Sequence, residues 1–262
     1  MKFKEIRFGP AGMGGVDAAE DRLEYYSKKG LKACEIAFTY GVYIKNKEDA
    51  IRIGKKAKEL DIKLSIHAPY WINLNSKEKI KIEESKKRIL GCCKVGDLLG
   101  AYVIVFHPGY YGGMDKEETY QNIKKAVLEI KEEIKKNKWK INIAAETTGK
   151  VNVFGSVEEI YRLVEETSCS FTIDFAHILA REKSVDYEKI KKLFGKYKCW
   201  HCHFSGIEYT EKGERKHKKT GKENWKKLLK ELPKDKEIVI INESPYDVED
   251  SVEGLSIISQ TK

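Results

Sequence analysis

The chain has 262 residues, enough to bury a full hydrophobic core. Its 50 lysines and arginines outnumber its 41 aspartates and glutamates, and the net charge of +9 favours a polyanionic partner, although a lysine- and glutamate-rich thermophilic surface would explain the same charge. No apolar stretch approaches the roughly eighteen residues of a membrane span, and the first residues lack the pattern of a secretion signal. We therefore expect a cytoplasmic protein without membrane association, with its six cysteines as ordinary buried thiols.

Short apolar runs alternate with longer amphipathic ones along the whole chain. The eight strand-then-helix pairs are residues 6–8 and 17–29, 33–38 and 47–60, 63–67 and 76–99, 102–107 and 116–137, 141–146 and 156–167, 170–174 and 186–196, 198–203 and 222–232, and 237–242 and 248–259. Strands that alternate with helices run parallel, so eight units predict an α/β protein, a closed (β/α)8 (TIM) barrel forming a single domain over residues 1–262. A doubly wound open sheet is the competing fold, but the glycine-rich turn at residues 9–15 does not fit its phosphate-binding fingerprint.

Six of the predicted strands end in a histidine or a carboxylate. These residues are His67, His107, Glu146, Asp174, His203 and Glu243. In a parallel barrel the carboxyl ends of all strands lie on one rim, so we expect these side chains to converge. A polar strand cap would explain any one of them, but it is a poor explanation for all six.

The residue types at this rim favour particular metals. His177 and His217 add two imidazoles close to the six strand-end groups. Mixed imidazole and carboxylate ligands suit zinc or manganese, whereas magnesium and calcium prefer oxygen ligands throughout. Two or more such ions can polarise a phosphodiester and neutralise its leaving oxygen.

The rim residues also occur in recognisable motifs. These are Ser65-Ile-His67-Ala-Pro-Tyr70-Trp-Ile-Asn73, Phe106-His107-Pro-Gly109, Ala145-Glu146-Thr-Thr-Gly149, Ile173-Asp174-Phe-Ala-His177, His203-Phe-Ser and Asn242-Glu243-Ser-Pro245. Together they resemble the endonuclease IV family, the zinc-dependent apurinic/apyrimidinic (AP) endonucleases of base-excision repair, which have a xylose-isomerase-like barrel. The resemblance implies hydrolysis of the phosphodiester 5′ to an abasic site in double-stranded DNA, leaving a 3′-hydroxyl, by an enzyme that we expect to be monomeric.

The resemblance also implies two or three zinc ions, with manganese as an alternative. Glu146 would bridge two ions, and Glu146, Asp174 and Glu243 would take part in catalysis. The ligands implied are His67, His107, Glu146, Asp174, His177, His203, His217 and Glu243.

The third zinc ion is where the sequence departs from the family pattern. The family places an aspartate two residues before the position of His217, and this chain has Arg215 there. Glu214, one residue earlier, either replaces that aspartate as a ligand or is a solvated loop charge.

Possible DNA contacts follow the rim residues. Tyr70, Trp71 and Asn73 come directly after His67, and an aromatic side chain at a barrel mouth can wedge between bases. Lys216 and Lys218 lie in a basic loop, residues 203–224, and could neutralise phosphates. Glutamates interspersed in that loop leave a simply solvated segment as the alternative.

Two rival functions remain open. Glu146, Asp174, His203 and Glu243 alone also resemble the single-metal quartet of xylose-isomerase-like sugar isomerases and epimerases. One metal ion does not require the four further histidines, which favours the endonuclease. The other rival is a metal-bearing barrel that binds abasic DNA without cutting it. We expect His201, two residues before His203, to have a supporting or core role.

Overall fold

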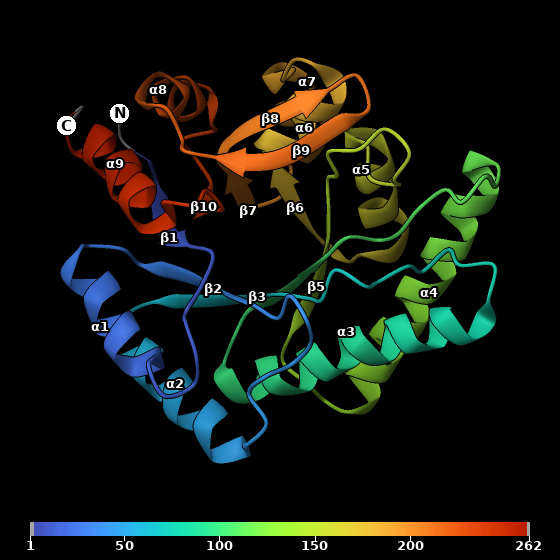
Figure 1. Ribbon diagram of the computed structural model, residues 1–262, viewed down its shortest axis with the longest axis horizontal. Coiled ribbons are helices and arrows are strands. Elements are labelled where there is room, and N and C mark those ends of the chain that lie inside the picture. Colours follow the sequence, from blue (N-terminus) through green and yellow to red (C-terminus); the bar gives the residue numbers. More distant parts are fainter. Residues whose placement is uncertain (1–2, 261–262) are drawn as a thin grey trace.

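Eight parallel strands form one sheet that curves round on itself in the computed structural model, which describes residues 3–260. The predicted (β/α)8 barrel is therefore confirmed (Figure 1). In the order in which they pair, the strands are β1 (Glu5–Pro10), β10 (Glu237–Asn242), β7 (Cys199–Phe204), β6 (Ser170–Asp174), β5 (Asn142–Glu146), β4 (Val103–Phe106), β3 (Lys63–His67) and β2 (Ala33–Ala37).

The barrel closes between β1 and β2 through a few backbone contacts. The N–H of Lys32 donates to the carbonyl of Phe8 at 3.0 Å, and Ala11 forms an isolated parallel bridge with Glu35. A Cβ atom on Gly9 would lie only 1.9 Å from the carbonyl oxygen of Ala33. Glycine at this position therefore lets the two strands approach closely enough to close the barrel.

Helices surround the sheet on the outside (Figure 1). Several begin at side-chain caps, such as Asp115, which accepts from two backbone N–H groups, and Ser156, which forms a capping box with Glu159. The main core lies between the sheet and these helices and includes Phe8, Trp200 and Trp225. The outer helices are α1 (Ala19–Lys28), α2 (Lys47–Glu59), α3 (Lys79–Leu99), α4 (Lys116–Lys136), α5 (Val157–Thr167), α7 (Tyr187–Phe194), α8 (Lys222–Glu231) and α9 (Asp247–Ser259).

Two features differ from the expected pattern. A short helix, α6 (Phe175–Glu182), begins directly after β6. Part of the predicted basic loop instead forms an antiparallel hairpin of β8 (Gly206–Thr210) and β9 (Gly213–Lys218). The hairpin packs against α6 and lies on the same side of the barrel as β6 and β7 (Figure 1).

The interior of the barrel contains both apolar and polar side chains. Side chains alternate between the two faces of each strand, so Ile238 and Ile240 of β10 face the helices while Val239 and Ile241 belong to a separate apolar cluster. By the same alternation, β2 and β7 turn Glu35, His201 and His203 inward. Inside the barrel, β10 therefore contributes apolar side chains while β7 beside it contributes buried histidines.

The cysteine prediction is confirmed with one exception. All six thiols are free; Cys199 is exposed and the other five are buried. Within residues 3–260, no helix combines the length and apolar character that crossing a membrane would need.

Candidate metal centre

Strand register brings the six predicted strand-end residues to one rim. Asp174 lies directly beside His203 across the β6–β7 ladder, and His203 lies beside Ile241 of β10, two residues before Glu243. On the other side of the barrel, His67 at the end of β3 pairs with Val105, two residues before His107. The expected convergence of these residues is therefore observed.

Glu146 lies at the centre of the cluster and is completely buried. Its Oε2 lies 3.1 Å from Nε2 of His67 and 2.9 Å from Nε2 of His107. Its Oε1 lies 3.0 Å from Nδ1 of His203 and 3.4 Å from Nδ1 of His177. One carboxylate thus contacts imidazoles from β3, β7, α6 and the loop after β4.

Asp174 and Glu243 complete the inner part of the cluster. Oδ1 of Asp174 accepts the backbone N–H of His177 at 2.8 Å and so caps α6, while Oδ2 lies 3.2 Å from Nδ1 of His177. Oε1 of Glu243 lies 3.3 Å from Nδ1 of His203. The ligand atoms of Glu146, Asp174, His203 and Glu243 all lie within 4.8 Å of one another.

The hairpin adds Glu214 and His217 at the outer edge. Oε2 of Glu214 lies 3.4 Å from Nε2 of His177, and ligand atoms of these three residues lie within 4.8 Å of one another. A Cβ on Gly149 would lie 2.7 Å from the Cβ of Glu214, so glycine there allows this approach. Arg215 instead forms an ion pair with Glu208 at 2.9 Å. Glu214 therefore lies beside the rim histidines, and its role as a metal ligand stays a prediction.

Charge complementarity within the cluster shifts several pKa values. Burial disfavours the charged form of His67, but Glu146 outweighs burial and raises the pKa of His67 to about 9. Although burial alone would raise the pKa of Glu146, His203 and His107 hold it well below its usual value. Burial raises the pKa of Glu243. The imidazoles and carboxylates therefore compensate one another's charge.

The polar atoms of the cluster fit divalent cations. Nε2 of His107 lies near Glu146 and Oδ2 of Asp174 lies near His177, but within residues 3–260 neither buried atom has a partner in hydrogen-bond geometry. Unsatisfied buried polar atoms are uncommon in proteins and suggest an ion that would satisfy them. The donor set, imidazole nitrogen with carboxylate oxygen, suits zinc or manganese. The identity of each ligand stays a prediction.

A cavity of about 280 Å³ opens above the cluster and is lined by His67, Tyr70, His177, Glu243 and Lys150, among others. Sequence reasoning missed Lys150. It directly follows the motif that ends at Gly149, but no sequence pattern marks it as a functional residue.

The side chains predicted to contact DNA have different surroundings. Tyr70 and Trp71 are 58% and 61% exposed, and Lys216 and Lys218 are exposed on β9. Asn73 instead organises the loop, because its Oδ1 accepts backbone N–H groups of Asn75 and Tyr110 at 3.1 and 3.3 Å. These contacts give Asn73 a structural role, and the DNA contacts of all five residues stay predictions.

One buried carboxylate escaped the sequence analysis. Glu35 of β2 is completely buried, and its Oε2 lies 3.0 Å from Nε2 of His201. It stands inside an otherwise apolar strand, and strands of parallel sheets usually read as continuous apolar runs. A lone glutamate in such a strand was the available signal. His201 contacts Glu35 and Tyr102, in keeping with the supporting role expected for it.

Relatives of this chain include proteins with and without an assigned function. The uncharacterized protein MJ0133 of Methanocaldococcus jannaschii is 39% identical over 264 residues, covering 94% of each chain. A protein named probable endonuclease 4 from Aquifex aeolicus is 26% identical over 204 residues, covering 71% of this chain and 72% of that one.

Solved structures share the fold at low sequence identity. SacUVDE superposes with a TM-score of 0.78 at 16% identity, covering 98% of each chain. Endonuclease IV from Thermus thermophilus gives 0.71 at 19% identity, covering 97% of this chain and 98% of that one. A D-psicose 3-epimerase also gives 0.71, at 16% identity and with 96% and 97% covered.

A family profile ties the fold and the rim together. It describes the xylose isomerase-like TIM barrel and matches residues 23–260, which include every side chain of the cluster. With its closed parallel barrel and its metal-binding residue types at the carboxyl rim, the chain belongs to the xylose isomerase-like TIM barrel family.

Proposed function

We propose that this protein is a metal-dependent AP endonuclease that cuts the phosphodiester 5′ to abasic sites in double-stranded DNA. The observation that carries the proposal is the number of ligand-type side chains around Glu146. Three of the rim groups that could hold an ion share Glu146, and a further group is formed by His177, Glu214 and His217. Such a set exceeds what one cation needs and suits a centre of two or three ions.

In this proposal the rim residues would be divided among two or three ions. His67, His107 and Glu146 would hold one, and Asp174, His203 and Glu243 would hold a second beside Glu146. His177, Glu214 and His217 would hold a third at the mouth. Bound zinc or manganese would supply Lewis acidity toward a phosphoryl oxygen and neutralise developing charge.

The chain's own residues would select and position the substrate. Lys150 lines the cavity and offers a cation to a phosphate, while Tyr70 lines the same cavity and excludes water from part of it. Tyr40 and Trp71 pack edge to face with ring centroids 6.3 Å apart, and they are 84% and 61% exposed. Exposed aromatic rings beside a charged cavity suit stacking on bases next to a gap in a duplex.

Sugar isomerisation or epimerisation with one metal ion is the second candidate. The group Glu146, Asp174, His203 and Glu243 supports it, since this group alone could hold one ion. The cavity of about 280 Å³ is also close in volume to the smallest small-molecule pockets. The extra histidines at the mouth count against it, because a single ion would not use them as ligands.

Metal analysis coupled to a nicking assay tests the proposal. We expect the purified protein, reconstituted with zinc or manganese, to hold at least two ions and to nick a duplex with one abasic-site analogue on its 5′ side. An undamaged duplex of the same sequence should stay intact. Intact abasic substrate at two or more ions per chain would contradict the proposal, and one ion together with turnover of a ketose would favour the epimerase.

A further inference from the structure

Two imidazoles of the rim cluster, those of His67 and His177, direct one ring nitrogen to a backbone carbonyl. Nδ1 of His67 donates to the carbonyl of Ala68 at 2.8 Å, and Nδ1 of His177 donates to the carbonyl of Thr147 at 3.0 Å. Each ring is thereby oriented with Nε2 toward the rim. A metal-binding histidine usually has such an outer partner, which fixes both the ring and its tautomer.

His203 is oriented the opposite way. Its Nδ1 faces Glu146 and Glu243, at 3.0 and 3.3 Å, so its Nε2 points down into the barrel. There Nε2 lies 3.0 Å from Oε1 of Glu35, and both atoms are completely buried. Neither atom has a hydrogen bond in the described part of the chain, so the ion-pair contact between them is the one interaction available to both.

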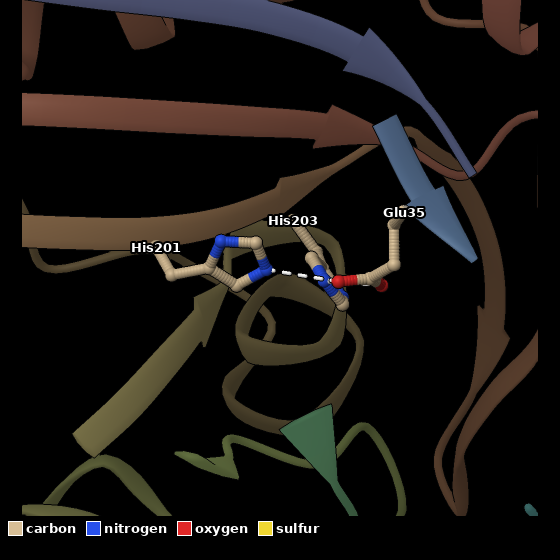
Figure 2. A group of neighbouring side chains, drawn as sticks. All are labelled: Glu35, His201 and His203. Atoms are coloured by element: carbon tan, nitrogen blue, oxygen red, sulfur yellow. Dashed lines mark hydrogen bonds and ion pairs between the residues drawn. The ribbon is translucent and has the colours of Figure 1, made fainter. Parts of the chain in front are cut away.

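Glu35 is itself held by groups from two other strands, β3 and β7. Figure 2 shows its carboxylate reaching from β2 toward both histidines of β7. Ser65 of β3 donates to Oε2 of Glu35 at 2.7 Å, and Nε2 of His201 lies 3.0 Å from the same oxygen. The hydroxyl of Tyr102 meets Nδ1 of His201 from below.

The donor and the acceptor of each contact around Glu35 can be assigned. An ionised carboxylate can only accept, so Ser65 and Nε2–H of His201 donate to Oε2 of Glu35. Nδ1 of His201 is then bare and accepts from Tyr102. Oε1 remains for the Nε2–H of His203. Nδ1 of His203 donates to Oε1 of Glu146 at 3.0 Å. An ion bound at the rim would replace that proton on Nδ1, while the proton on Nε2 would stay toward Glu35.

We propose that Glu35 is a positioning residue that fixes His203 in the tautomer and orientation which present Nδ1 to a metal ion at the rim. Ser65, His201 and Tyr102 hold Glu35 in place for that task. The inference rests on the metal-binding part of the proposed function and does not depend on the substrate being DNA.

Zinc affinity of the Glu35→Gln variant is the first test. Glutamine keeps the shape of the side chain but loses the charge, and we expect affinity measured by competition with a chelator to fall about ten- to a hundredfold. Ser65→Ala removes one donor to Glu35 and should weaken zinc binding by about two- to tenfold, which serves if Glu35→Gln does not fold. Thr172→Val is the matched control, because Thr172 is buried and its hydroxyl has no partner among residues 3–260.

Imidazole proton spectra of the zinc-loaded protein give a readout that simple loss of stability would not mimic. The Nε2 proton of His203 should give a slowly exchanging resonance in the parent protein and in Thr172→Val. In Glu35→Gln that resonance should shift upfield or exchange faster, while the signals of His67 and His177 stay in place.

The outcomes separate this inference from the proposed reaction. Unchanged zinc affinity and an unchanged His203 resonance in Glu35→Gln would overturn the positioning role, even in a protein that nicks abasic DNA. Loss of one whole ion with an intact rim would also overturn it and would place that ion between Glu35, His201 and His203. A parent protein that binds no zinc would defeat both this inference and the proposed function.

Discussion

Each end of the barrel has a cavity, and the two cavities differ in volume and in the residues that line them. The amino-terminal end has the larger cavity, about 720 Å³, whose lining includes Lys63, Tyr102, Cys199 and Glu237. Its charges are satisfied: Lys4 pairs with Glu237 at 3.0 Å, and Lys63 lies over the Tyr102 ring at 4.3 Å. The carboxyl-terminal cavity is smaller but sits on clustered histidines and carboxylates that could hold a metal ion. The residue types that line a cavity, rather than its volume, therefore mark the candidate site.

Replacing the central carboxylate should produce the largest contrast between the two ends. Glu146→Gln removes a charge that four imidazoles share, so we expect loss of bound metal and a fall in nicking rate of at least about a thousandfold. Glu237→Gln, at the opposite end, should leave both unchanged. Elemental analysis and single-turnover nicking measure the two effects, and an active, metal-replete Glu146→Gln protein would refute the assignment of the centre.

Replacing Glu214 tests whether the hairpin contributes a metal ligand to the rim. Since Glu214 and His217 approach His177 only through the hairpin, Glu214→Gln should lower the metal content by one ion and slow nicking by about ten- to a hundredfold. Glu211→Gln is the matched control, because Glu211 is exposed in the turn of the same hairpin. Equal metal content in the two variants would show that Glu214 is not a ligand.

Charge reversal at the hairpin tests whether the carboxyl end receives the polyanion. Lys216→Glu with Lys218→Glu should weaken binding to abasic duplex by about tenfold and lower the salt dependence by about one unit for each lost phosphate contact. Lys55→Glu with Lys58→Glu changes the same charge on α2, beside the amino-terminal end, where both lysines are exposed. Binding titrations at several salt concentrations provide the measurement, and similar losses in both double variants would indicate attraction by net charge alone.

The smallest expected effect is the pH dependence of metal binding. The pKa of His67 is raised to about 9, whereas a metal ion needs the unprotonated imidazole. Below that pH the ion must displace a proton, so zinc affinity should rise with pH and level off near pH 9. Calorimetry in buffers of different ionisation enthalpy would detect the released protons. Zinc affinity that does not change between about pH 6.5 and 8.5 would show that zinc binding does not release a proton from His67.

Much of the fold and of the rim was predictable because apolar strands ended in chemically distinctive residues. His67, Glu146 and Asp174 each close a strand, and the parallel topology alone requires such ends to meet. His203 is the last residue but one of β7. The convergence of distant residues therefore follows from the order of elements along the chain.

The remainder depended on tertiary contacts that a linear pattern does not encode. Helix α6 has only eight residues and follows its strand without a loop. The hydrophobic periodicity of so short a segment does not predict a separate helix. The charged hairpin sequence resembles a solvated loop, and its pairing is supported by packing on α6. Glu35 is a single glutamate in an apolar strand, and the sequence alone does not show that the closed barrel buries it beside His201 and His203.

The direct passage from β6 into α6 limits how this stretch can change in length. Asp174 ends the strand and caps the helix, so the Asp174–His177 spacing spans less than one helical turn. Inserting a single residue between them would rotate the imidazole by about 100 degrees around the helix axis and turn it away from the carboxylates. Natural insertions and deletions in homologous chains should therefore avoid residues 174–177 and accumulate in the turn at 211–212.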